Sequence, residues 1–258
     1  MMNETKKSVC PGCGIEMNIE ELAYTQRVCP NCNYHYPMGA DERIRLLIDE
    51  GTFVEYDSEM ESSNPLNFPE YEDKLIKDKK LTGLKEAVIT GEGLINGLPT
   101  TIGITDYRFR MGSMASVFGE KVARCAEHAL EKRLPMIIVS SSGGGARMQE
   151  GLISLMQMVK TSAVCMKLRQ ARLLYVDVLS YQSFAGVMAS FATLGHIIIA
   201  EPGTRVGFTG ERGRASVKQN LPVGFQTAEF MVERGTIDMI VQRKNLKTTL
   251  FKLLDFFS

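Results

Sequence analysis

The chain has 258 residues, enough for one large hydrophobic core and a small additional unit. Its 30 Lys and Arg residues balance 30 Asp and Glu residues, so no overall charge directs the protein towards nucleic acid or a membrane surface. No apolar run approaches the roughly 20 residues that a membrane span requires, and the N-terminus lacks the apolar segment of a signal peptide. These features predict a soluble, cytoplasmic protein whose six cysteines stay reduced.

Four of the cysteines form two Cys-x-x-Cys pairs that are fifteen residues apart, namely Cys10, Cys13, Cys29 and Cys32. Four thiolates at this spacing are typical of a tetrahedral zinc site. Because four sulfur ligands leave no open position, such a metal stabilises its segment and does not catalyse. Two disulfides and a redox Cys-x-x-Cys are weaker alternatives in a reduced chain. We therefore expect a structural zinc ribbon over residues 1–38, with His35 outside the ligand set.

Residues 39–258 are expected to form a second, larger domain. Its first element is a short helix from Asp41, and a polar, irregular surface connection follows over 56–80. Two β-rich runs then flank Asn96 and Gly97. This dipeptide tolerates the positive φ angles of a two-residue turn, so the pattern predicts a hairpin.

Strands and helices alternate after the hairpin. A helix over 111–133 and an apolar strand over 135–140 come first, and a second helix is expected from Ala146. On the second helix, five apolar residues at helical spacing are expected to pack inward, namely Met148, Leu152, Leu155, Met156 and Val159. The later elements are a strand over 173–180, a helix of small residues over 187–195 and two short strands within 196–210. A helix over 225–235, a strand over 236–242 and a final helix from 246 on complete the chain. This order indicates a layered α/β domain with parallel buried strands.

Two strand-to-helix junctions are nearly bare of side chains, over 142–146 (Ser-Gly-Gly-Gly-Ala) and 183–186 (Ser-Phe-Ala-Gly). Backbone N–H groups at a helix N-terminus lack partners, and glycine lets an anion approach them. The junctions therefore predict an oxyanion site for a carbonyl that becomes an enolate. The alternative is that the glycines only permit tight turns. Neither junction carries the phosphate-loop motif, and the G-x-S-x-G of a serine hydrolase is missing.

The chain resembles the family of the bacterial acetyl-CoA carboxylase carboxyltransferase β subunit, in the four-cysteine ribbon and in further stretches. These are NPLNFPEYEDKL, TGLKEAVITGEG, YRFRMGSMASVFGEK, GGARMQEGLISLMQM, EPGTRVGFTG and GFQTAEFMVERGTIDMIV. The resemblance implies a crotonase-like (ClpP/crotonase) superhelix of β-β-α units. It also implies a heterotetramer with an α-type subunit, and transfer of a carboxyl group from carboxybiotin, on a separate biotin carboxyl carrier protein, to acetyl-CoA. The product would be malonyl-CoA, for fatty acid biosynthesis.

The resemblance also implies where the chemistry takes place. The family's active site lies between the β and α subunits, where paired backbone oxyanion holes hold the thioester enolate and the biotin urea oxygen. In this chain the matching catalytic positions are Gly143, Gly144, Gly145, Ala185 and Gly186, and Phe184 and Arg147 are expected to bind substrate. Few basic residues surround the ribbon cysteines, which disfavours nucleic acid as the main partner.

Both junctions depart from the family pattern. The chain reads SSSGGGARM where S-A-S-G-G-A-R-M is usual, and QSFAGVMAS where P-T-x-G-G-V-S-A-S is usual. The Cβ of Ala185 is expected to crowd a substrate or to disfavour a positive φ, and Phe184 adds bulk. The segment 207–222 departs as well. These differences suggest a divergent paralogue. Two alternatives stay open: a decarboxylase or carboxyltransferase acting on another acyl thioester in a polyketide-type pathway, and a non-catalytic partner subunit.

Overall fold

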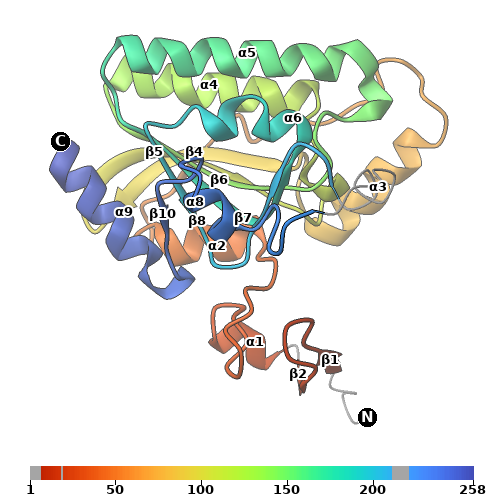
Figure 1. The fold of residues 1–258 in the computed structure, drawn as a ribbon. Coiled ribbons are helices and arrows are strands. Elements are labelled where there is room, and N and C mark those ends of the chain that lie inside the picture. Colours follow the sequence, from red (N-terminus) through yellow and green to blue (C-terminus); the bar gives the residue numbers. More distant parts are fainter. Residues whose placement is uncertain (1–6, 19, 211–220) are drawn as a thin grey trace.

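The structure is a computed structural model that describes residues 7–18, 20–210 and 221–258. Residues 211–220, which include most of the divergent segment 207–222, lie outside the described residues. The chain builds a small N-terminal unit and a larger sheet-and-helix domain (Figure 1). The small unit contains β1 (Lys7–Val9), β2 (Glu16–Asn18) and α1 (Glu21–Tyr24).

An eight-stranded sheet is the centre of the larger domain. Its strand order is β10-β8-β7-β6-β5-β4-β3, and β9 pairs with the end of β7. The strands β3 to β5 are antiparallel, whereas β5 to β10 pair in parallel. The strand bounds are β3 Val54–Tyr56, β4 Val88–Ile95, β5 Leu98–Thr105, β6 Met136–Ser142, β7 Tyr175–Phe184, β8 Ile197–Ala200, β9 Arg205–Gly207 and β10 Met239–Ile240.

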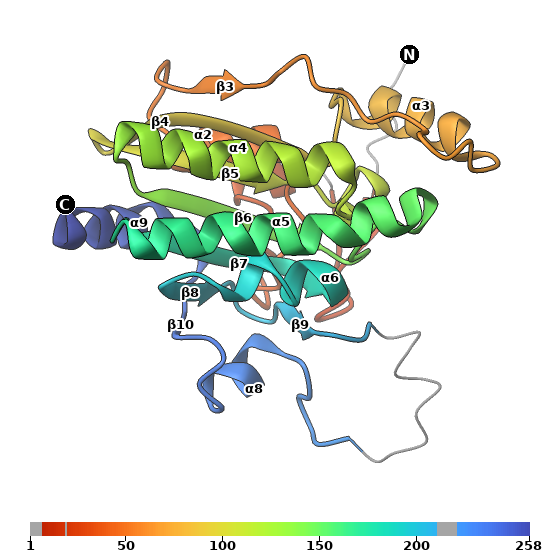
Figure 2. The same cartoon turned by 90° about the horizontal axis from the view of Figure 1, so that it is seen from above.

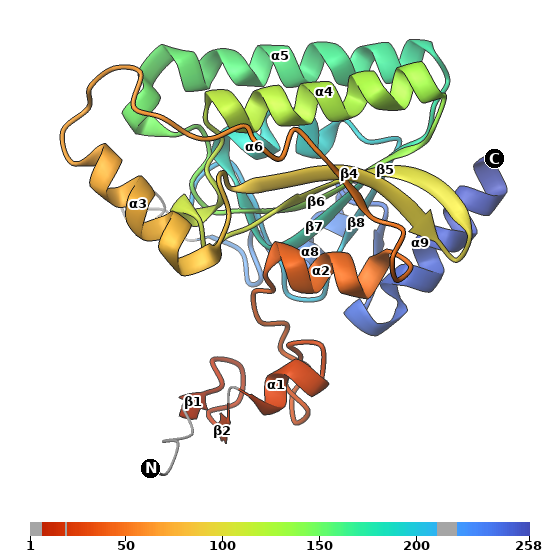
Figure 3. The ribbon, with the colours of Figure 1, turned by 180° about the vertical axis from the view of Figure 1, so that it is seen from behind.

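Helices cover both faces of the sheet. On one face α4 (Ser116–Lys132) and α5 (Gly151–Gln170) lie side by side (Figure 2). On the other face lie α2 (Ala40–Leu47) and α9 (Arg243–Phe257) (Figure 3). The apolar strands supply both cores because successive side chains point to opposite faces. In β6, Ile138 joins the core under α4 and α5, while Ile137 joins the core over α2 and α9.

Several sequence expectations are confirmed. The layered α/β architecture, the helix α4 and the buried parallel strands are all present. The hairpin between β4 and β5 turns at Asn96 (φ 48°) and Gly97 (φ 85°), both in the left-handed region. In α9 the side chains of Leu250 and Leu254 are buried, whereas Phe257 is exposed. No helix of the described ranges is long and apolar enough to cross a membrane.

The expected irregular connection over 56–80 was wrong in its second half. Residues Tyr71–Thr82 form the helix α3, whose side chains Tyr71 and Leu75 are buried in the main core. Because seven of its twelve residues are charged, the local sequence carries only a weak apolar period. Contacts with the rest of the domain, not local propensity, therefore hold this helix.

The two helices expected after the bare junctions were also misplaced. After β6 the chain makes a 3-10 turn over Met148–Glu150, and α5 begins only at Gly151. The strand β7 continues through Phe184, and the following helix α6 is only Ala185–Met188, with a 3-10 turn over Phe191–Thr193. The small helix α8 (Ala228–Val232) matches the expected helix over 225–235. Backbone contacts in the junctions override the local helix pattern.

The five apolar side chains near the start of α5 face solvent instead of the core. Leu152 is 75% exposed and Met148 is 74% exposed, and Leu155, Met156 and Val159 are exposed as well. The inner side of α5 instead buries Ser154, Gln157 and Thr161 against α4 and the sheet. Gln157 lies directly over Gly119 of α4, which leaves room for it. The helix carries apolar residues on both sides, so periodicity alone did not identify the buried one.

A carboxyl group is buried in the middle of the sheet. Asp177 on β7 is fully buried and accepts hydrogen bonds from the hydroxyls of Tyr175 (3.0 Å) and Ser140 (3.1 Å). Burial raises the pKa of Asp177 to about 8, although both hydrogen bonds favour its ionised form. The side chain is therefore mainly protonated in the folded protein at neutral pH.

This burial predicts a pH-dependent stability. Between the ordinary Asp pKa of about 3.9 and the folded value of about 8, unfolding releases a proton. Stability should therefore fall as pH rises through this window, by at most about 1.4 kcal/mol per pH unit from this group. Denaturant unfolding at several pH values should show a flatter profile for Asp177→Asn than for the unaltered protein. Identical slopes in the two proteins would contradict the assignment.

Candidate functional site

The two bare junctions lie side by side. Strands β6 and β7 are adjacent and parallel, and Ser142 pairs with Ser183 at their carboxyl ends. A Cβ atom placed on Gly145 would lie 2.6 Å from the Cβ of Ala185 and 3.1 Å from the backbone nitrogen of Gly186. A Cβ on Gly186 would in turn lie 3.0 Å from the nitrogen of Ala146. The chain therefore requires glycine where the two backbones approach one another.

The backbone N–H groups of the glycine loop have different partners. Those of Gly143 and Gly144 both donate to the carbonyl oxygen of Met111, at 2.9 and 3.2 Å. Within the described ranges no hydrogen bond reaches the N–H groups of Gly145 and Ala146. Gly186 lies in the first turn of α6, where N–H groups have no partner within the helix. The amides that remain available for a ligand are thus those at the meeting point of the two junctions.

The helix expected from Ala146 does not begin at these amides. The carbonyl of Gly145 accepts from the N–H of Met114, and the N–H of Arg147 donates to the carbonyl of Met114. These two bonds make the backbone extended between the glycines and the 3-10 turn, so α5 starts farther on. Any oxyanion stabilisation here would come from individual N–H groups.

Ala185 adopts the backbone conformation that was expected to suit glycine. Its φ is 51°, in the left-handed region, and that of the facing Gly145 is 59°. The methyl group of Ala185 occupies the space next to Gly145, where no other Cβ would fit. Phe184, a predicted substrate contact, is only 3% exposed, so its bulk lies in the protein interior.

Arg147, the other predicted substrate contact, is enclosed behind the loop. Its side chain is 1% exposed and forms an ion pair with Glu86, which is fully buried. The guanidinium also donates to the hydroxyl of Tyr71 (3.1 Å) and to the carbonyl of Ser113 (2.8 Å). Burial opposes the charge, but Glu86 holds the pKa of Arg147 above its usual value. Arg147 thus anchors the loop from behind.

Tyr71 and Glu150 complete this anchor, and the sequence analysis missed both. The Tyr71 hydroxyl donates to Glu150 (3.0 Å), and Glu150 also accepts from the N–H of Ser116 at the start of α4 (2.7 Å). Tyr71 belongs to α3, in the segment that looked irregular. The stretch GGARMQEG did contain Glu150, but its partners are distant in sequence and no local pattern reveals them.

The four cysteines of the N-terminal unit converge. Their sulfur atoms all lie within 4.8 Å of one another, with 3.6 Å between Cys10 and Cys32 and 3.9 Å between Cys13 and Cys29. Four sulfurs around a tetrahedral zinc ion with bonds of about 2.3 Å would be about 3.8 Å apart, so the set fits such an ion. His35 lies apart from the sulfurs, and its Nε2 accepts from the backbone N–H of Arg243 (3.3 Å).

The conformation of Ala185 predicts an unusual response to glycine. A left-handed φ costs an L-residue roughly 1 kcal/mol, which Ala185→Gly would relieve while making the unfolded chain more flexible. We expect its free energy of unfolding to be unchanged or to rise by up to about 1 kcal/mol. The matched variant Ala189→Gly, at an ordinary φ of −81°, should lose stability. An equal loss of unfolding free energy in both variants, measured by denaturant unfolding, would show that the backbone at Ala185 is not strained.

Comparison with known proteins assigns a family to this site. Residues 37–254 match the carboxyl transferase domain family. The chain is 53% identical to the acetyl-coenzyme A carboxylase carboxyl transferase subunit beta of Desulforamulus reducens over 246 residues. This alignment covers 95% of this chain and 85% of the relative. This confirms the resemblance noted in the sequence.

Solved structures of low identity share the fold. The transcarboxylase 12S core is 24% identical with a TM-score of 0.74, over 92% of this chain and 43% of the transcarboxylase chain, so this protein spans less than half of it. A Pseudomonas malonate decarboxylase hetero-tetramer is 22% identical with a TM-score of 0.68, over 85% of this chain and 82% of that one. The chain belongs to the carboxyl transferase family, as a homologue of the acetyl-CoA carboxylase carboxyl transferase β subunit.

Proposed function

We propose that the protein is the β-type subunit of an acetyl-CoA carboxylase carboxyltransferase. In this reaction carboxybiotin, on a separate biotin carboxyl carrier protein, gives its carboxyl group to acetyl-CoA, and malonyl-CoA is formed. The observation that carries the proposal is the meeting of the two junctions at Gly145 and Gly186 in a member of the carboxyl transferase family. Within the described ranges, the N–H groups of Gly145 and Ala146 at this point donate to no protein acceptor.

These amides suit the charge that develops in the reaction. The acetyl methyl group loses a proton, and the negative charge moves to the thioester oxygen before the new carbon–carbon bond forms. The bond between the biotin nitrogen and the carboxyl carbon breaks, and the biotin urea can accept the proton. N–H groups aimed at the developing oxyanion stabilise the transition state more than the ground state. We assign this role to the amides of Gly145, Ala146 and Gly186, and a shaping role to Gly143 and Gly144.

The exposed apolar stripe of α5 supports an α-type partner subunit. One apolar strip is formed by Met148, Leu152, Leu155, Met156 and Val159, and Leu66 lies next to Gly151, the first residue of α5. Apolar surface of this kind is typical of a protein interface. The strip begins a few residues after the glycine loop. A partner seated on it would cover the open side of the junctions and complete the site.

The N-terminal unit is proposed as a structural zinc ribbon over 1–38, ahead of a carboxyltransferase domain over 39–258. Two similar turns present the sulfurs. The N–H of Gly14 donates to the carbonyl of Cys10, and the N–H of Asn33 donates to that of Cys29, both in the short loops that contain the cysteines. Four thiolates close the coordination sphere, so the ion would hold the ribbon together without taking part in the reaction.

The reverse reaction tests the proposed function. The purified protein, with a matching α-type subunit, should carboxylate free biocytin with malonyl-CoA as donor. Release of acetyl-CoA without biocytin would instead identify a decarboxylase, and absence of either reaction would favour another acyl thioester or a non-catalytic subunit.

One substitution at the meeting point of the two junctions should strongly lower turnover. In Gly186→Ala the new methyl group would lie 3.0 Å from the nitrogen of Ala146 and cover its N–H. Loss of one oxyanion donor lowers turnover on the order of 100-fold. Gly210→Ala is the matched control, because a Cβ there meets nothing within 4 Å. Full activity of Gly186→Ala in the biocytin assay would refute the assigned role.

The ribbon should lose its metal when one sulfur is replaced. Cys29→Ser should bind well below one equivalent of zinc at neutral pH, because a hydroxyl is a poor substitute for a thiolate. The larger domain should keep its own unfolding transition. Cys165→Ala, a buried cysteine on α5 outside the cluster, is the control and should retain zinc. A full equivalent of zinc in Cys29→Ser, measured after dialysis, would contradict the ligand set.

A further inference from the structure

A cleft of about 650 Å³ lies between the ribbon and the carboxyl end of the sheet. Asn33 and Tyr34 line it from the ribbon, and Tyr181, Gln182 and Gly203 line it from the domain. The domain residues belong to the end of β7 and to the turn between β8 and β9. Two parts of the chain that are far apart in sequence therefore form opposite walls of one cavity.

The cleft borders the glycine loop. The Oε1 of Gln182 would lie 2.9 Å from a Cβ atom on Gly143. The ring of Tyr107 would lie 2.8 Å from the same atom, and it packs edge-on against the ring of Tyr181 with 4.8 Å between centroids. Gln182 of the cleft lining thus also lies against the loop that carries the proposed oxyanion amides, next to Tyr107.

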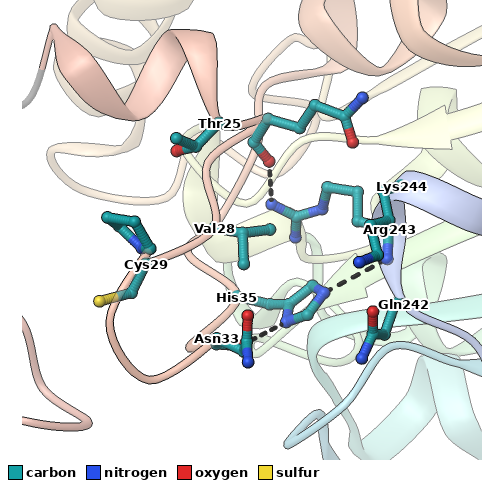
Figure 4. Close-up of a pocket in the computed structure, with 10 residues that line it drawn as sticks. Thr25, Val28, Cys29, Asn33, His35, Gln242, Arg243 and Lys244 are labelled. Carbon is teal, nitrogen blue, oxygen red and sulfur yellow. Dashed lines mark hydrogen bonds between the residues drawn. The ribbon is translucent and has the colours of Figure 1, made fainter.

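A buried arginine fastens the ribbon wall to the domain. Arg243, at the start of α9, donates to the carbonyl oxygens of Gln26 (2.9 Å), Arg27 (3.1 Å) and Tyr36 (3.0 Å) of the ribbon. Its backbone N–H also donates to His35, as Figure 4 shows. Three carbonyls and one imidazole of the ribbon therefore depend on a single residue of the larger domain.

The same guanidinium is fixed from the domain side by Glu201. This carboxylate follows β8 directly and accepts from Arg243 at 2.6 and 2.8 Å. It also pairs with Arg43 of α2 and accepts from the hydroxyl of Ser180 (3.0 Å). Burial opposes its charge, but the two arginines hold the pKa of Glu201 well below the usual range. Glu201 lies one residue before the turn that lines the cleft, so the clamp and the cleft are continuous.

The lining, which also includes Arg205, suits a flat group that forms hydrogen bonds. Tyrosine rings stack on such groups, and the amide side chains of Asn33 and Gln182 can both donate and accept. Within the proposed reaction two substrates carry a group of this chemistry: the adenine of the CoA thioester and the ureido ring of biotin.

We propose that the ribbon is the outer wall of a substrate subsite in this cleft. Tyr34 contacts the flat heterocycle there, and Arg243 is the positioning residue that holds the wall against the domain. The inference deepens the proposed function and rests on it for the identity of the ligand.

Binding measurements test the subsite without turnover. Titration calorimetry with CoA and, separately, with biocytin would use the complex with the α-type subunit. Tyr34→Leu should weaken the binding of one of the two ligands at least threefold, with zinc content unchanged. The ligand that is weakened identifies the source of the heterocycle. Tyr24→Leu is the matched control, because this ribbon tyrosine is 90% exposed and lies outside the cleft lining.

Variants of the clamp separate positioning from direct contact. Arg243→Met leaves Glu201 paired with Arg43, and it should weaken the same ligand while Arg243→Lys restores part of the affinity. Should Arg243→Met fail to fold, the Tyr34→Leu result alone decides. Affinities of Tyr34→Leu within threefold of the unaltered complex, or no binding of either ligand to that complex, would overturn the proposal. Missing turnover with the expected binding losses would contradict the proposed reaction and leave the subsite intact.

Discussion

The parallel pairing of β6 and β7 is the constraint on which the site depends. Parallel neighbours end at the same edge of a sheet, so the chain must turn twice within a few ångströms. The irregular register between Ser140 and Ser142 shifts the end of β6 along β7, and Ser142 then lies opposite Ser183. Apolar side chains on both faces of these strands lock the register, because a slip by one residue would exchange the two cores. Side-chain-free backbone at Gly145 and Gly186 is the result of this geometry.

Buried ion pairs then make the surrounding loops rigid. Arg147 with Glu86, and Glu201 with Arg43 and Arg243, are enclosed by protein and would be costly if either partner were missing. Each cluster joins elements that are remote in the sequence. The first holds the glycine loop against α3 and the start of α4, and the second joins the N-terminal unit, α2, α9 and the end of β8. Such clusters restrict motion of the loops where the amides are presented.

The parts of this fold that rest on local chemistry could be predicted from the sequence. The turn at Asn96 and Gly97, the apolar strands and the convergence of four cysteines all follow from residue type and spacing. Features that depend on long-range contacts could not be predicted from the sequence. The helix α3 has a weak apolar period and is held by Tyr71, and the outward direction of Leu152 depends on Gln157 filling a space above Gly119. At the candidate site, the sequence located both junctions. It did not reveal which amides already donate hydrogen bonds within the protein, because the Met111 carbonyl that accepts from Gly143 and Gly144 belongs to another loop.

The apolar strip on α5 also has a consequence for how the protein is made. A chain synthesised in excess of the proposed partner would expose this strip to other newly made chains, and exposed apolar surface favours self-association. Balanced synthesis of the two subunits would keep the strip covered from the start. The strip on which the proposed partner would sit thereby also links the solubility of one gene product to the supply of another.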